Sequence, residues 1–365
     1  MGFEFGGEAS PPPFQERSRG ALLGLAVGDA LGTTLAFREP KSPPFPQLAT
    51  GPHRDMVGGG PFKLVAGQVT DVTQMACCLA ASLRARGRFD AAGVAARYVG
   101  WQEHAFEIDG QIAAALNAIR EGAAPLEAGE VVWARSPKPP AGNASLARTA
   151  PIGVLVPGPE ARRAAALADC AITHHDPRCR LACAAFDAAL AVAIRGAAAP
   201  TVLRDAAARE LWDAAPALRG EKNTSGDRVS AAVHNLEEDL ALASRDDPQL
   251  LHGPVHLHRS QGFVRVAFRL AFWELLHAPS FEAGLVDVVN RGGDADANGA
   301  ITGALLGAFF GEGAIPAAWR ERVLEALPRE DGPLRDAYHP AALLEALEER
   351  EPVLAIPDPA GPRPP

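Results

Sequence analysis

Apolar residues recur at spacings of three and four along most of the chain. One stripe consists of Met75, Cys78, Leu79 and Leu83, and part of another lies within residues 343–347. These spacings place side chains on one face of a helix. Alternating polar and apolar runs, which are typical of half-buried strands, are nearly absent, and alanine is abundant. The pattern therefore predicts an all-α protein, folded as a compact helical bundle without a sheet of three or more strands.

The two ends of the chain depart from this pattern. Residues 1–16 and residues 352–365 are rich in Pro and Gly, which predicts a flexible N-terminal tail and a Pro-rich C-terminal tail. Residues 17–351 are then expected to form a single helical domain. Within it, the Gly- and Pro-bearing stretches 38–69 and 125–153 are too long and irregular for ordinary helix connections, and long loops often build a binding site.

Composition narrows the classes of protein that fit. The 365 residues are 47% hydrophobic and 22% charged, which is typical of a soluble globular protein with a sizeable core. The net charge of −9 and the lack of a Lys/Arg cluster argue against direct nucleic-acid binding. No apolar run reaches the roughly 18 residues that span a bilayer, and the N-terminus lacks a secretory signal. We therefore expect a cytoplasmic protein without a membrane segment, and a monomer.

The five cysteines are expected to be buried apolar residues. Their number is odd and they lack a paired CxxC spacing, so neither a zinc site nor a disulfide framework is indicated.

Two segments have a structural interpretation that suffices when each is taken alone. In the segment 17–37, Gly24 and Gly28 let a helix pack closely ahead of Asp29, which is interpreted as a satisfied polar residue near the helix end. In the segment 67–75, Thr70 or Asp71 caps a helix, and Gln74 completes a capping box.

Two further segments suggest ligand binding. Asp294 and Asp296 follow a glycine pair and precede an apolar helix. One carboxylate suffices to cap a helix, so the second indicates a hard cation such as Mg²⁺ or Mn²⁺, with a solvated acidic turn as the alternative. The stretches 142–148 and 173–177 carry polar side chains suited to hydroxyls and phosphates, with an Asx turn and a helix-capping His as the alternatives.

Taken together and in order, these segments resemble the ADP-ribosylglycohydrolase family, which includes the enzyme that reactivates dinitrogenase reductase. The resemblance covers about residues 17–330. It rests on GALLGLAVGDALG, on GGGPF with GQVTD-x-TQMA, on GNASLAR-x-API, on THHDP, and on SFEAGLVDVVNRGGDADANGAITGALLGAFFG running on to IPAAW. The combination is far more specific than any single motif.

The resemblance implies an orthogonal helical bundle whose cleft holds two Mg²⁺ or Mn²⁺ ions under the distal ribose of ADP-ribose. It implies metal ligands at Thr70, Asp71, Asp294 and Asp296. The three aspartates among them are the catalytic candidates, and the implied substrate-binding residues are Gly142, Asn143, Ser145, His174 and Gly293. The implied partner is ADP-ribose or an ADP-ribosylated protein or small molecule.

The sequence departs from the family pattern at three positions. The acidic residue expected eight positions after Gly28 is Ala36, the second Asp of a Thr-Asp-Asp-Thr run is Val72, and the Thr expected after the last Asp is Ala297. Each change removes an oxygen from the expected cluster. The sequence therefore predicts a metal-dependent hydrolase of an ADP-ribosyl bond that is impaired at these positions. The alternative is a catalytically inactive protein of the same fold that binds ADP-ribose or a nucleotide.

Overall fold

The computed structural model of the protein describes residues 13–40, 51–221, 223–326 and 337–348. Its α-helices are α1 (Phe14–Gly32), α2 (Asp71–Arg86), α3 (Ala91–Gln102), α4 (Gly110–Arg120), α5 (Ala128–Arg135), α6 (Ala144–Arg148), α7 (Ala150–Leu155), α8 (Pro159–Thr173), α9 (Pro177–Ile194), α10 (Pro200–Leu218), α11 (Gly226–Ala243), α12 (Val264–His277), α13 (Phe281–Asn290), α14 (Ala295–Phe310), α15 (Ala317–Glu325) and α17 (Ala341–Glu348). Short 3₁₀ helices are η1 (Thr33–Leu35), η3 (Pro125–Glu127) and η4 (Glu312–Ala314). Within these residues the chain forms isolated β-bridges but no sheet, which confirms the all-α prediction.

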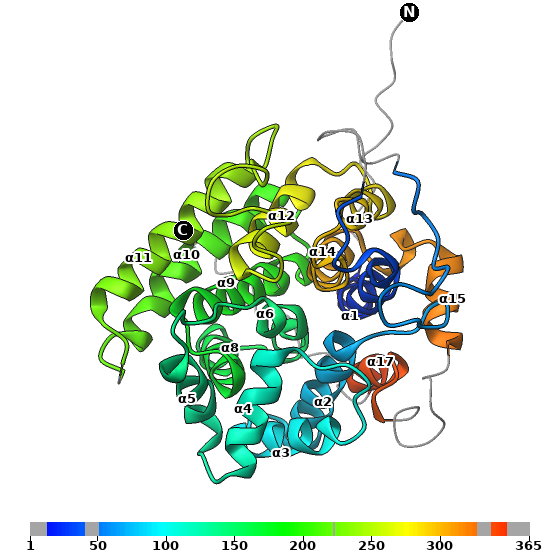
Figure 1. Ribbon diagram of the computed structural model, residues 1–365. Coiled ribbons are helices and arrows are strands. Elements are labelled where there is room, and N and C mark those ends of the chain that lie inside the picture. The colour runs from blue at the N-terminus through cyan, green and yellow to red at the C-terminus, as the bar shows by residue number, and fades with distance from the viewer. Residues whose placement is uncertain (1–12, 41–50, 222, 327–336, 349–365) are drawn as a thin grey trace, which may run out of the picture.

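The first helix and α14 lie side by side in the middle of the molecule (Figure 1). Glycines spaced four apart on α1 meet small residues of α14 in the opposite order, as the pairs Gly20–Gly307, Gly24–Gly303, Gly28–Gly299 and Gly32–Ala295. A Cβ on any of these four α1 glycines would overlap a backbone carbonyl oxygen of α14. The predicted packing role of Gly24 and Gly28 is thereby confirmed, and the close contact sets Asp29 beside the start of α14.

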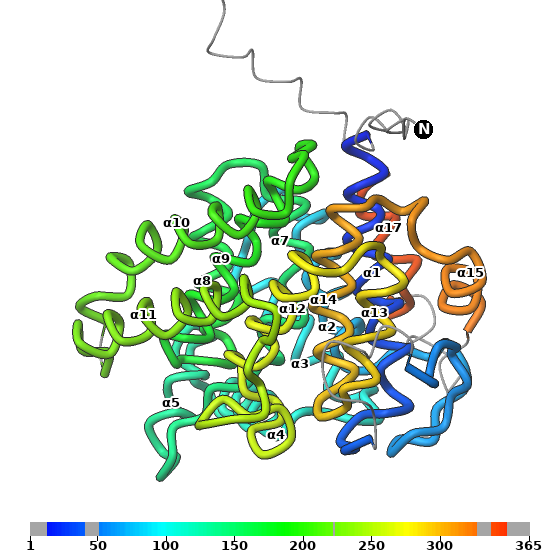
Figure 2. The backbone as a smooth tube through the Cα atoms, turned by 90° about the horizontal axis from the view of Figure 1, so that it is seen from above, coloured from blue at the N-terminus to red at the C-terminus, as the bar shows by residue number. Residues whose placement is uncertain are grey.

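The other helices surround this pair in different directions, as a view from above shows (Figure 2). On one side α9 packs against α8, α10 and α14, and α11 packs against α12. On the other side α17 contacts both α1 and α2, so that the two ends of the described chain meet. One large cluster of buried apolar side chains extends from Ala21 to Ala346. All four described ranges contribute to this cluster, and the single domain stays a prediction.

Two details of the predicted organisation are wrong. Helix α1 begins at Phe14, so the last three residues of the predicted tail 1–16 are helical; residues 1–12 and the predicted tail 352–365 lie outside the described residues. The stretch 125–153 is mostly helical, because it contains η3, α5, α6 and α7. Its prolines mislead, since Pro125 and Pro151 stand in the first turns of η3 and α7, where a missing N–H costs little.

The five cysteines are buried and form no disulfide, as expected. Among the described residues, no helix is both long enough and apolar enough to cross a membrane. The predicted compartment and the monomeric state stay predictions.

Candidate active site

Asp29 fastens the start of α2 to the end of α1. Its fully buried carboxylate accepts hydrogen bonds from the backbone N–H of Thr70 (3.0 Å) and of Thr73 (3.2 Å). The hydroxyls of the same two threonines also donate to it, at 2.8 and 2.5 Å. Burial raises the pKa of Asp29 to about 6, although these hydrogen bonds oppose the shift. Asp29 was interpreted from the sequence as a satisfied polar residue, and its contacts show that it also positions the GQVTD segment.

The capping prediction for α2 is confirmed at one residue and wrong at another. The hydroxyl of Thr70 accepts from the backbone N–H of Val72, so Thr70 is the N-cap. Gln74 does not complete a capping box, because its side-chain oxygen accepts a hydrogen bond from the indole of Trp101 at 2.8 Å. Tertiary packing against α3 has replaced the local partner.

Asp71 forms a carboxyl pair with Glu107, a residue of the loop between α3 and α4. Asp71 is buried, and it also accepts a hydrogen bond from the backbone N–H of Asp109 at 3.3 Å. Burial and the neighbouring Glu107 raise the pKa of Asp71 well above its ordinary value. Burial raises the pKa of Glu107 to about 7, and repulsion from Asp296 adds to this shift. Because two carboxyl groups can hydrogen-bond only when one keeps its proton, the pair shares a proton near neutral pH.

Asp294 and Asp296 form a second carboxyl pair at the start of α14. The amide of Asn143 donates to Asp294 at 2.8 Å, which joins the GNAS loop to the acidic turn. Burial and the adjacent Asp294 raise the pKa of Asp296 well above its ordinary value, and Asp29 and Asp71 add to this shift. The three predicted catalytic aspartates therefore lie in one acidic cluster, formed by Asp29, Asp71, Glu107, Asp294 and Asp296.

The turn before this pair needs its two glycines. Gly292 and Gly293 have φ values of +74° and +68°, which other residues rarely adopt. Gly293 also forms two backbone hydrogen bonds, from its N–H to the carbonyl of Arg38 (2.8 Å) and from the N–H of Phe37 to its carbonyl (2.6 Å). These bonds bring Ala36, one of the three departures from the family pattern, next to the acidic turn. The predicted role of Gly293 in substrate binding remains a prediction.

The GNAS loop is held by its backbone. Gly142 forms a β-bridge with Phe263, and a Cβ on Gly142 would lie 3.0 Å from the side chains of both Gln111 and His174. Ser145 is fully buried, and the thiol of Cys170 donates to its hydroxyl at 3.2 Å. The hydroxyl of Ser145 therefore faces the interior, so any contact of this residue with a ligand would have to use its backbone.

His174 lies against this loop at the end of α8. Its Nδ1 pairs with the hydroxyl of Thr173 at 2.7 Å, and burial lowers the pKa of His174 well below its ordinary value. Its Nε2, beside Gly142, has no hydrogen-bond partner among the described residues. A neutral ring nitrogen next to Gly142 is suited to a polar ligand atom. His174 is also the C-cap of α8, where its backbone N–H donates to the carbonyl of Cys170 at 2.7 Å, as the capping alternative predicts. Asp176 caps the start of α9 by accepting from the backbone N–H of Arg178.

Sequence reasoning missed Glu107 and Asp109. Asp109 caps α4 by accepting from the backbone N–H groups of Gln111 and Ile112. The signal was available, because Glu107 and Asp109 are two carboxylates separated by one residue at a helix start, as Asp294 and Asp296 are. The sequence did not reveal that the loop between α3 and α4 brings Glu107 to Asp71 at the start of α2.

The residue types of the acidic cluster suit a metal ion, but their arrangement in the structure does not. Buried carboxylate oxygens that raise one another's pKa are the ligand type that Mg²⁺ and Mn²⁺ prefer. In the described part of the chain, however, no group of three or more His, Cys, Asp or Glu side chains is placed so that it could hold one ion. The carboxyls face each other in pairs, and the hydroxyl of Thr70 is engaged by Asp29. As arranged, the site does not fit the metal, which stays a prediction.

The fold and the site together define a helical protein in which carboxyl groups from α1, α2, the loop before α4 and the start of α14 meet in one buried cluster. A profile of the ADP-ribosylglycohydrolase family matches residues 10–352, and the chain belongs to this family. It is 31% identical to the ADP-ribosylarginine hydrolase Tri1 of Pseudomonas putida (strain GB-1), over 86% of this chain and 76% of that protein. It is 29% identical to the ADP-ribosyl-[dinitrogen reductase] glycohydrolase of Rhodospirillum rubrum, over 87% of this chain and 94% of that protein.

A solved structure agrees with this assignment. A chain of an ADP-ribosylglycohydrolase-related protein complex superimposes with a TM-score of 0.66 and 29% identity, covering 91% of this chain and 97% of that chain. The predicted family and fold are confirmed, and the names of the relatives support the predicted class of enzyme.

Proposed function

We propose that the protein is a hydrolase that removes ADP-ribose from a modified protein or small molecule. The relatives named above, which act on ADP-ribosylarginine and on ADP-ribosylated dinitrogen reductase, support this reaction. The observation that carries the proposal is the acidic cluster beside the Asn143 loop, in which each buried carboxyl has other carboxyls as its neighbours. Perturbed carboxyls grouped in this way are typical of catalytic sites.

Glu107 is proposed as the proton-transfer group of this site. Ala36 removed the acid or base expected from the family pattern, and Glu107 places a carboxyl in the same cluster from another loop. With a pKa of about 7, Glu107 is present in both protonation states near neutral pH, which suits general acid–base catalysis. It takes a proton from the attacking water, and the proton shared with Asp71 goes to the leaving nitrogen or oxygen. The bond from the anomeric carbon to the leaving nitrogen or oxygen breaks, a bond to the water oxygen forms, and free ADP-ribose is released.

Mg²⁺ or Mn²⁺ is proposed as the cofactor, because the cluster is rich in carboxyl oxygens that raise one another's pKa. Binding requires the Asp71–Glu107 and Asp294–Asp296 pairs to separate and lose their shared protons. Calorimetry with MgCl₂ or MnCl₂ in two buffers of different ionisation enthalpy would then detect both ion binding and proton release. Absence of binding up to about ten millimolar would remove the metal from the proposal.

The activity is tested by chromatography of free ADP-ribose after incubation with an ADP-ribosylated arginine or serine peptide. Glu107→Gln should lower kcat by about a hundredfold or more, since it removes the proton-transfer group but keeps the shape. The control is Glu103→Gln, which changes an exposed carboxylate of the neighbouring turn and should leave kcat unaltered. Release by neither the unaltered chain nor any metal-loaded sample would contradict the proposed reaction.

The second candidate is an inactive protein that binds ADP-ribose or a nucleotide, and Ala36, Val72 and Ala297 favour it. This candidate requires that the protein binds ADP-ribose but releases no ADP-ribose from a modified substrate of any linkage. The combined change Ala36→Glu, Val72→Asp and Ala297→Thr tests whether the missing side-chain oxygens at these positions cause the lack of hydrolysis. A large rise in release by this variant would support an impaired hydrolase, whereas tight binding with no release in either protein would favour the inactive binder.

A further inference from the structure

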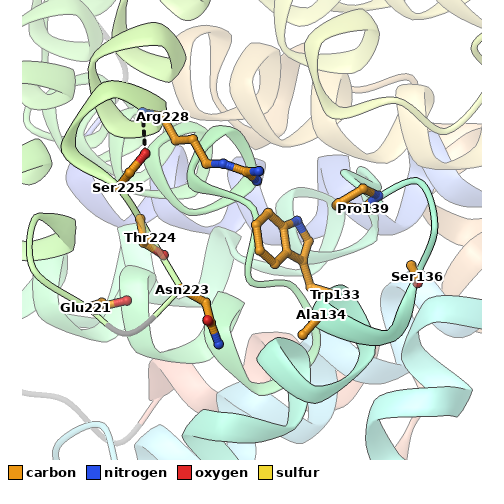
Figure 3. Close-up of a pocket in the computed structure, with 9 residues that line it drawn as sticks. All are labelled: Trp133, Ala134, Ser136, Pro139, Glu221, Asn223, Thr224, Ser225 and Arg228. Carbon is orange, nitrogen blue, oxygen red and sulfur yellow. Dashed lines mark hydrogen bonds between the residues drawn. The ribbon is translucent and has the colours of Figure 1, made fainter.

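A cavity of about 610 Å³ opens between α5 and the N-terminus of α11 (Figure 3). Its wall includes Trp133 and Ser136 on one side and Asn223, Ser225 and Arg228 on the other. It shares no residue with the acidic cluster or with the GNAS loop. A volume in this range is typical of small-molecule sites.

Trp133 brings an unpaired donor to this cavity. Its side chain is only 6% exposed, yet its indole N–H has no hydrogen-bond partner among the described residues. In Figure 3 the ring nitrogen faces the gap between Arg228 and Pro139. A buried donor without an acceptor is unfavourable by about 1–3 kcal/mol, so this N–H points to an acceptor supplied by a ligand.

Arg228 adds an unmatched positive charge. Its guanidinium lies over the ring of Trp133, 4.9 Å from the ring centroid, and makes no ion pair with a described residue. Glu221 also lines the cavity, but it is neutralised by an ion pair with Arg180. Asp227 follows in the first turn of α11 and is exposed outside the lining. Stacking fixes the plane of the guanidinium and leaves its N–H edges free to donate.

The N-terminus of α11 also favours a negatively charged ligand. Ser225 is the N-cap, and its hydroxyl oxygen accepts the backbone N–H of Arg228 at 3.3 Å. The earlier N–H groups of an α-helix lack partners within the helix, and the helix dipole makes this end positive. An indole N–H, a guanidinium and a helix N-terminus therefore converge on one space, and all three favour an oxyanion.

We propose that this cavity binds the phosphate of a small phosphate monoester whose body carries hydroxyl groups. The phosphate takes the Arg228 and Trp133 end, because the donors are there. The cavity is larger than a bare phosphate needs, and Ser136, Asn223 and Glu221 provide oxygens for hydroxyl groups on the rest of the ligand. The site is independent of the hydrolase proposal and lies outside the acidic cluster.

The experiment follows the indole N–H signals of the full-length protein labelled with ¹⁵N-tryptophan. Trp133→Phe assigns the signal of Trp133, because it deletes one peak and keeps a ring in place. Inorganic phosphate and glucose 6-phosphate are titrated separately, with sodium chloride of equal ionic strength as the reference. We expect both to shift the Trp133 signal, with a dissociation constant of about 1 mM for inorganic phosphate and tighter binding of glucose 6-phosphate.

Arg228→Gln should weaken both affinities by about tenfold or more, because it removes the charge-assisted hydrogen bonds. Arg88→Gln, a change at an exposed arginine in the turn after α2, is the matched control and should leave them unchanged. Equal affinity for the two phosphates would confirm the oxyanion site and overturn its extension to a hydroxyl-bearing body. No shift of the Trp133 signal beyond that of chloride, or equal binding by Arg228→Gln, would overturn the site itself.

Discussion

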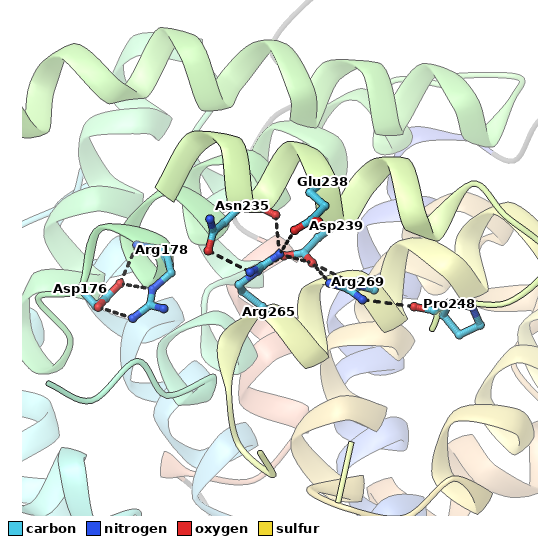
Figure 4. A network of polar contacts seen from close by, with 8 residues as sticks. All are labelled: Asp176, Arg178, Asn235, Glu238, Asp239, Pro248, Arg265 and Arg269. Atoms are coloured by element: carbon cyan, nitrogen blue, oxygen red, sulfur yellow. Dashed lines mark hydrogen bonds and ion pairs between the residues drawn. The ribbon is translucent and has the colours of Figure 1, made fainter. Parts of the chain in front are cut away.

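Asp239 and Asp296 are both inaccessible to solvent, but the chain treats their charges in opposite ways. Two arginines of α12 surround Asp239 of α11 (Figure 4). Arg265 donates to it at 2.7 and 3.0 Å, and Arg269 donates at 2.8 and 2.5 Å. Asp296, by contrast, has Asp294, Asp29 and Asp71 as its charged neighbours. Asp239 has two arginine counterions, whereas the charged groups that act most strongly on Asp296 are other carboxyls.

The pKa values follow this difference. Burial raises the pKa of Asp239, and the two arginines oppose the shift. Burial raises the pKa of Asp296 as well, and the neighbouring carboxylates raise it further, well above its ordinary value. A buried carboxylate paired within the chain stabilises the fold, whereas a group of buried carboxylates without cations requires a proton, a ligand or a metal ion from outside. The comparison therefore separates the structural acids from the functional ones.

The largest effect should come from Asp296→Asn. The amide keeps the shape and supplies its own N–H donor to Asp294 in place of the shared proton, so the protein should fold at least as stably as before. ADP-ribose release should fall by about a hundred- to ten-thousand-fold, because the variant lacks a carboxylate of the acidic cluster in which we propose that the reaction takes place. Chromatographic assay and urea denaturation on one sample measure both quantities. A destabilised variant with unchanged kcat would place Asp296 among the structural acids.

Asp239→Asn should have the reverse outcome. The change removes the buried negative charge that Arg265 and Arg269 share, which typically lowers the free energy of unfolding by about 3–5 kcal/mol. Because Asp239 makes no contact with the acidic cluster, kcat per folded molecule should stay the same. Urea denaturation gives the stability, and an assay at low temperature gives the activity. A large loss of kcat in fully folded protein would contradict the separation.

The sequence predicted the helical fold better than the assembly of the acidic cluster. The helical fold followed from apolar spacing, and the close packing of α1 followed from Gly24 and Gly28, because both signals are local. Its partner α14 was not predicted. The cluster of Asp71, Asp294 and Asp296 came from the family resemblance. Glu107 was missed, because only the turn between α3 and α4 brings it to Asp71.

Gln74 also shows that spacing along the chain does not predict a partner from another helix. Its position three residues after Asp71 predicts a local capping box, but its side-chain oxygen accepts a hydrogen bond from the buried indole N–H of Trp101. A spacing rule describes neighbours along the chain and cannot weigh a partner that another helix supplies. The arginine network of Asp239 was unpredictable for the same reason, since Arg265 and Arg269 reach it from α12.

The pH dependence of stability should reveal the raised pKa of Asp29 in the acidic cluster. The pKa of Asp29 rises from an ordinary 3.8 to about 6 in the folded protein, so Asp29 holds its proton more tightly when folded. Its contribution to stability is fully present below about pH 4 and is lost as the pH rises to about 6, a change of about 3 kcal/mol. Urea denaturation in EDTA at several pH values measures this slope. Asp29→Asn should flatten it, and an equal slope in the variant would exclude Asp29 as the cause.

The smallest effect is expected from Gly28→Ala, which tests how the cluster is assembled. A Cβ at residue 28 would overlap the carbonyl of Gly299, so α1 and α14 must move apart, at a cost of about 1–3 kcal/mol in the free energy of unfolding. The movement would also separate Asp29 from Asp296, and kcat should fall in protein that is still fully folded. The control is Gly100→Ala on α3, where a Cβ would meet no atom within 4 Å and the helix should be slightly stabilised. Thermal unfolding and ADP-ribose release are measured for both variants. If Gly28→Ala lowers stability alone and leaves kcat untouched, the glycine contact serves only the fold, and the distance between the two helices does not set the chemistry of the acidic cluster.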